Sequence, residues 1–103
     1  MATTHFPTQV VLKEYSDNAT LNITEANREA DVYWIVLKND LNFRVTVNLY
    51  KPCLIEIYYD EQHYNQTTYL LKLNEVKYAN SFSIDTYRND EGSLSCQWAK
   101  VYL

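Results

Sequence analysis

The side chains of this sequence that could carry out catalysis or hold a metal are few and widely spaced. The two histidines, His5 and His63, have no Cys or His about two to four residues away, which is the spacing of a structural zinc site. The acidic pairs at 60–61 and 90–91 lack the alternating oxygen ligands of a calcium loop. The sequence has no Gly-x-Ser-x-Gly motif and no glycine-rich phosphate loop. We therefore expect no enzyme activity, no metal site and no cofactor.

Three Asn-x-Ser/Thr triplets could accept N-linked glycans, and they begin at Asn18, Asn22 and Asn65. Chance alone would give roughly one or two such triplets in a chain of this composition. Cys53 and Cys96 could form one disulfide in an oxidising compartment or remain two buried thiols in a reducing one. Together these signals favour an extracellular protein, either secreted or the ectodomain of a cell-surface protein.

Length and charge limit the remaining possibilities. A chain of 103 residues with 47% hydrophobic and 21% charged residues suits one folded domain, which we expect to span 1–103. The net charge of -4 provides no basic surface for a phosphate backbone, so we expect no nucleic-acid partner. No apolar run approaches the roughly 20 residues of a membrane helix. We therefore expect contact with a membrane only through segments outside this chain.

Apolar and polar residues alternate along most of the chain, as expected for strands whose successive side chains point to opposite faces. Turn-forming residues, among them Ser16-Asp17-Asn18 and Lys51-Pro52, recur about every ten residues. Residues 25–30 are mostly polar, lack an apolar stripe and favour a loop or one short turn. The alternating pattern predicts an all-β domain of about seven strands, six of them covering 19–24, 43–49, 55–59, 69–73, 82–84 and 94–98.

Three segments resemble an immunoglobulin-superfamily domain of the variable type. Residues 10–24 resemble its first hairpin, and Trp34 lies eleven residues after Ile23, where such domains place their core tryptophan. Residues 90–96 resemble the run that ends in the second sheet cysteine. The resemblance implies an antiparallel two-sheet sandwich with Trp34 in the core, although Ile23 replaces the first cysteine and Leu94 replaces the corner tyrosine.

The two cysteines admit two registers of this resemblance. In the first, Cys96 points into the core opposite Ile23 and Cys53 lies elsewhere, so no disulfide forms in the usual place. In the second, Cys53 and Cys96 are the paired sheet cysteines and would be bonded. In the first register only seven residues follow Cys96, too few for a loop and a final strand.

Residues 32–37 are apolar on both faces of a strand, which suits a central strand or one that meets a partner. If Trp34 lies in the core, alternation along the strand points Tyr33, Ile35 and Leu37 outward. Arg44 and Gln97 on neighbouring strands would then lie beside them. This reasoning predicts a partner-binding surface of Tyr33, Ile35, Leu37, Arg44 and Gln97. The alternative is that another segment of the same chain covers the stripe.

Taken together, these features predict a non-catalytic extracellular module of the adhesion or receptor type that recognises another protein or a second copy of itself. The alternatives are a sandwich or small barrel that binds a carbohydrate or lipid, and a small viral or structural subunit. A carbohydrate or lipid binder should have a concave aromatic-lined pocket, whereas a protein-recognition module should have a flat apolar face.

Overall fold

The computed structural model describes residues 8–38, 42–62, 70–88 and 94–103. Within these ranges every regular element is a strand, and residues 24–31 form a turn and loop, so the prediction of an all-β chain is confirmed. The six strands are β1 (Val10–Tyr15), β2 (Ala19–Ile23), β3 (Val32–Leu37), β4 (Phe43–Gln62), β5 (Leu70–Arg88) and β6 (Leu94–Tyr102).

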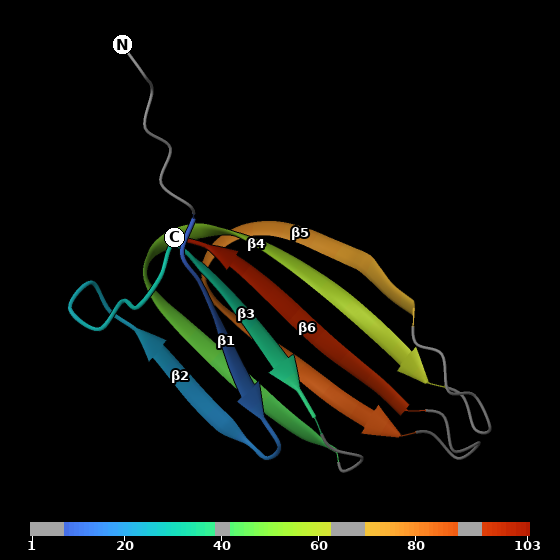
Figure 1. Ribbon diagram of the computed structural model, residues 1–103. Helices are drawn as coiled ribbons and strands as arrows, with labels where there is room; N and C mark the ends of the chain where they lie inside the picture. Colours follow the sequence, from blue (N-terminus) through green and yellow to red (C-terminus); the bar gives the residue numbers. More distant parts are fainter. Residues whose placement is uncertain (1–7, 39–41, 63–69, 89–93) are drawn as a thin grey trace.

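All six strands belong to one sheet in the order β1-β3-β6-β5-β4-β2, and β6 also pairs with β4. The β1–β3 and β2–β4 pairs are parallel, and the other pairs are antiparallel. This mixed sheet curls into a nearly closed, barrel-like shape (Figure 1). The prediction of an antiparallel two-sheet, immunoglobulin-like sandwich is therefore wrong.

The physical reason lies in β4 and β5, which are 20 and 19 residues long and run through both halves of the molecule. Lys51-Pro52, predicted to be a turn, lies inside β4 where the register with β5 shifts between Asn48 and Cys53. A bulge tolerates proline because its missing N–H need not pair. The chain changes direction here by bending a strand rather than by ending one.

The bend divides the sheet into two halves that share β4 and β5. The first, which we call the β2 half, contains β2, residues 43–49 of β4 and residues 81–88 of β5. The second, the β6 half, contains β1, β3, β6, residues 53–62 of β4 and residues 70–79 of β5. Beyond its pairing with β3, β6 pairs with the end of β5 and joins the two halves.

One hydrophobic core lies between the inner faces of the two halves. Full burial of an aliphatic side chain contributes about 1.5–3 kcal/mol, so these residues are the main source of stability. The core contains Ile23, Tyr33, Ile35, Leu37, Phe43, Val45, Val47, Leu49, Cys53, Ile55, Ile57, Phe82, Ile84, Ala99 and Val101.

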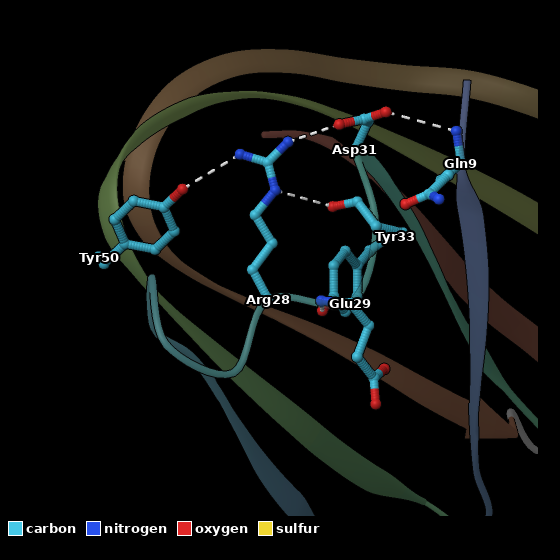
Figure 2. A network of polar contacts seen from close by, with 7 residues as sticks. Gln9, Arg28, Glu29, Asp31, Tyr33 and Tyr50 are labelled. Atoms are coloured by element: carbon cyan, nitrogen blue, oxygen red, sulfur yellow. Dashed lines mark hydrogen bonds and ion pairs between the residues drawn. The ribbon is translucent and has the colours of Figure 1, made fainter. Parts of the chain in front are cut away.

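A polar network fixes the loop that leads into β3 (Figure 2). The Arg28 guanidinium donates to the Asp31 carboxylate at 2.6 Å and to the Tyr50 hydroxyl on β4 at 3.3 Å. The Tyr33 hydroxyl accepts a hydrogen bond from the Glu29 backbone N–H at 2.8 Å. This bond satisfies the polar end of an otherwise buried ring, and it holds the first inward side chain of β3 in the core.

Candidate functional site

The outer side of the β6 half is the main candidate site, because its strands present apolar side chains away from the core. Cross-strand partners share a face of a sheet, so the register identifies the side chains on it. We call this surface the apolar face; it comprises Val10, Leu12, Val32, Trp34, Val36, Leu54, Tyr58, Leu71, Leu73, Val76, Tyr78, Trp98 and Tyr102.

Much of the apolar face is exposed. Seven of its residues have between 40% and 73% of their surface exposed: Val10, Leu12, Leu54, Leu71, Leu73, Val76 and Tyr78. In the first half of β5 the apolar side chains point outward, whereas Lys72 and Lys77 lie on the opposite side of the strand. A strand with one wet side usually has the reverse arrangement. Contiguous apolar patches of this kind mark interaction surfaces.

Aromatic side chains occupy the centre of the apolar face. The Trp34 ring lies 5.4 Å from the Tyr58 ring and 6.2 Å from the Trp98 ring, which meets it edge-on. These three rings come from β3, β4 and β6, and their packing partly buries each of them. Trp and Tyr are enriched in protein interfaces because a rigid ring provides a large contact area at low entropic cost.

Two opposite charges lie among these rings. Lys100 and Glu56 are cross-strand partners on β6 and β4. The Lys100 ammonium lies 4.8 Å from the centre of the Tyr102 ring and 5.4 Å from that of Trp34, and hydrogen bonding with Tyr102 raises the pKa of Lys100. Glu56 accepts hydrogen bonds from the hydroxyls of Tyr102 at 2.7 Å and Tyr58 at 3.2 Å. Both charges are therefore held in place on the face.

The stripe predicted from the sequence lies on the opposite side of β3. Tyr33, Ile35 and Leu37 are 2%, 0% and 2% exposed and belong to the core, whereas Trp34 lies on the outer side. The predicted orientation was wrong because it assumed that Trp34 is the core tryptophan. These three side chains cannot reach a partner, and we do not propose them as a binding surface.

Arg44 and Gln97, which were expected beside that stripe, both bond to Asp85 instead. Arg44 is on the outer side of the β2 half, where its guanidinium forms an ion pair with Asp85 at 2.7 Å. Gln97 is half-buried in β6, and its side-chain oxygen accepts a hydrogen bond from the Asp85 backbone N–H at 2.8 Å. Both side chains stabilise contacts within the chain.

The outer side of the β2 half is polar along its length. Thr46 and Ser83 share a hydrogen bond of 3.1 Å, and Asn48 bonds both Ser81 at 3.0 Å and Asn22 at 2.9 Å. The glycosylation candidate Asn22 therefore lies exposed on this polar surface, away from the apolar face.

The other glycosylation candidates have different surroundings. Asn18 is exposed, and its side-chain oxygen accepts a hydrogen bond from the Arg44 backbone N–H at 2.8 Å. Asn65 lies outside the described residues, as do His5 and His63. Among the described residues no group of three His, Cys, Asp or Glu side chains could hold a metal ion.

Cys53 and Cys96 are both free thiols. Cys53 is buried in the core and donates to the Lys51 carbonyl at 3.3 Å, and burial raises its pKa. Cys96 lies on the outer side of β6 beside Asp60, so the expectation that it points into the core opposite Ile23 is wrong. Burial and the neighbouring Asp60 raise the pKa of Cys96 to about 11. Both thiols are therefore poor nucleophiles at neutral pH.

A polar cavity of about 270 Å³ lies near the junction of β5 and β6, and Tyr59, Tyr87 and Asn74 contribute to its lining. A carbohydrate binder could use such a concave site. Two of its other polar groups, Asp85 and Gln97, already bond within the chain. This cavity is therefore a weaker candidate than the apolar face.

The described residues contain no helix that is long and apolar enough to cross a membrane. Comparisons with protein-family models, curated proteins and solved structures found no match to this chain. They do not identify it as a member of the immunoglobulin superfamily.

Proposed function

We propose that this protein is a non-catalytic protein-recognition module that binds a second copy of itself through the apolar face. The observation that supports the proposal is the presence of seven exposed apolar side chains on one side of one sheet. Covering these side chains would remove apolar surface from water at about 25 cal/mol per Å². A sheet face is also well suited to pack against a second sheet.

The charges on the face support a second copy as the partner. A closed dimer uses the same patch on both subunits, so the patch must be complementary to itself. Lys100 and Glu56 are neighbours across β6 and β4. A two-fold axis that runs along the strands between them would place Lys100 of each copy opposite Glu56 of the other. The chain carries a net charge of -4, but this central pair is neutral and would not repel its copy.

A secreted or cell-surface location belongs to the same proposal. Asn18 and Asn22 are exposed at the β2 half, so glycans attached there would leave the apolar face open. Self-association through an uncovered face is typical of adhesion between identical molecules, and no catalytic group is needed for it.

Sedimentation equilibrium of the wild-type chain tests the proposal together with a charge swap. We expect a monomer–dimer equilibrium in which Lys100→Glu or Glu56→Lys alone weakens association by about 10-fold, because like charges would then face each other. The double variant Lys100→Glu/Glu56→Lys should recover most of the affinity, since the swapped pair is again complementary. Circular dichroism would establish that each variant keeps its β structure.

Two results would contradict the proposal. A wild-type chain that stays monomeric to about 1 mM would have an affinity too weak for a specific interface. A double variant no better than the single variants would show that Lys100 and Glu56 do not meet across the interface.

A further inference from the structure

A second candidate binding site lies where β3 and β6 separate. Residues 98–102 of β6 pair with β3, whereas residues 94–96 at the start of β6 pair with β5. β3 ends near this point, so the sheet splits between the end of β3 and the start of β6. A cavity of about 290 Å³ occupies the split, and Val36, Leu94 and Trp98 contribute to its largely apolar lining.

The lining of the cavity includes a carboxylate with one oxygen that the described residues leave without a hydrogen bond. Asp60 lies on β4 next to Cys96 of β6 and contributes to the lining. Its Oδ1 atom is buried and has no hydrogen-bond partner among the described residues. Burial raises the pKa of Asp60, as expected when a carboxylate loses water without gaining a donor. A buried acceptor without a partner is costly, so its retention requires an explanation.

The other titratable groups of the cavity do not supply that donor. Lys38 lies in the lining, but its ammonium forms an ion pair with Glu14 at 3.4 Å. The Cys96 thiol neighbours Asp60, and the two are not joined by a hydrogen bond that would satisfy Oδ1. The site therefore combines an acceptor, an aromatic ring and apolar walls.

We propose that this cavity binds an alkylammonium group. The ammonium would donate to Asp60 Oδ1 near the Trp98 ring, and the alkyl stem would pack against Val36 and Leu94. A cation beside a carboxylate and an aromatic ring gains from charge-assisted hydrogen bonding and from cation–π attraction. The group could come from a free amine or from a lysine side chain of another protein. This site does not depend on the proposed self-association.

A titration of the 15N-labelled chain, followed by amide NMR at a concentration where it is monomeric, tests this site. We expect n-butylammonium to cause saturable shifts at residues 36, 60 and 94–98, whereas n-butanol and butanoate cause none. Nα-acetyl-lysine amide represents a lysine side chain of a protein. Binding of both amines would show that the site accepts a protein lysine, and binding of n-butylammonium alone would identify a free amine as the source.

Asp60→Asn keeps the shape of the side chain and removes its charge, so it should weaken n-butylammonium binding by about 10-fold or more. The matched control Asp85→Asn removes a carboxylate from the β2 half and should leave binding unchanged. Three results would overturn the proposal. They are binding of n-butylammonium by Asp60→Asn as tightly as by the wild-type chain, binding of n-butanol as tightly as n-butylammonium, and no saturable shift with either amine. The ligand comparison uses the wild-type chain, so it holds even if Asp60→Asn fails to fold.

Discussion

The two halves of this sheet have similar inner sides and contrasting outer sides. Inside, both contribute aliphatic and aromatic residues to one core. Outside, the β2 half is covered by hydrogen-bonded polar side chains such as Thr46, Ser83 and Asn48. Every strand of the β6 half contributes apolar or aromatic side chains to its outer side, with the charges of Lys100 and Glu56 among them. A sheet needs only one apolar side to fold, and the second apolar side of the β6 half is the basis of the proposed self-association.

The largest expected effect is on self-association, and two tyrosines of the same strand provide a matched test. Tyr78 is 73% exposed on the apolar face, and Tyr87 is 52% exposed near the end of β5, where its cross-strand partner is Ser95 of β6. We expect Tyr78→Glu to weaken the dimer by about 10-fold or more, because it would bury a charge in the interface. Tyr87→Glu should change the dissociation constant by less than about twofold. Sedimentation equilibrium measures both, and equal effects would remove the distinction between the two outer sides.

A second prediction compares the two sides of the β6 half itself. Ile35 is fully buried, whereas Leu12 is 52% exposed on the apolar face. Ile35→Ala should lower the free energy of unfolding by about 2–5 kcal/mol, because it leaves a cavity in the core. Leu12→Ala, measured in the monomer, should lower it by about 0.5 kcal/mol or less. Urea denaturation gives both values, and a small effect of Ile35→Ala would mean that β3 has the opposite orientation.

A third prediction concerns the thiol at the end of the apolar face. Cys96 has a pKa of about 11, raised first by burial and then by Asp60, whereas an unfolded chain would have a thiol pKa of about 8.5. The neutral Cys96 thiol therefore makes its full contribution to the free energy of unfolding below about pH 8.5. This contribution is lost as the pH rises towards 11, because the buried thiol must then ionise. In a Cys53→Ser variant, the rate of alkylation by iodoacetamide should have its midpoint well above that of free cysteine. A midpoint near pH 8.5 would show that Cys96 is solvated.

The local pattern of the sequence was sufficient for much of the secondary structure. The alternation over 19–24 and 43–49 predicted β2 and the first part of β4, and Ser16-Asp17-Asn18 does separate β1 from β2. The mostly polar residues 25–30 do form a turn and loop. These predictions succeeded because alternation and turn chemistry act over a few neighbouring residues.

The lengths of β4 and β5 could not be predicted in the same way. Lys51-Pro52 has the composition of a turn, but turns and bulges use the same residue types. β4 continues through Lys51-Pro52 because it pairs with β5 both before and after the register shift between Asn48 and Cys53. The parallel pairs β1–β3 and β2–β4 join segments distant in sequence, and no local pattern specifies them.

The sequence by itself determined that the chain is all-β. It also showed that the strand at 32–37 is apolar on both sides, so that either side could face the core. It could not determine which side faces the core, because alternation defines two sides without saying which one the sheet encloses. The tertiary structure decided this by curling the sheet so that Tyr33, Ile35 and Leu37 are enclosed and Trp34 lies outside. The same curl brings side chains from β1, β3, β6, β4 and β5 together on the apolar face, because pairing over long distances in sequence is what places them side by side.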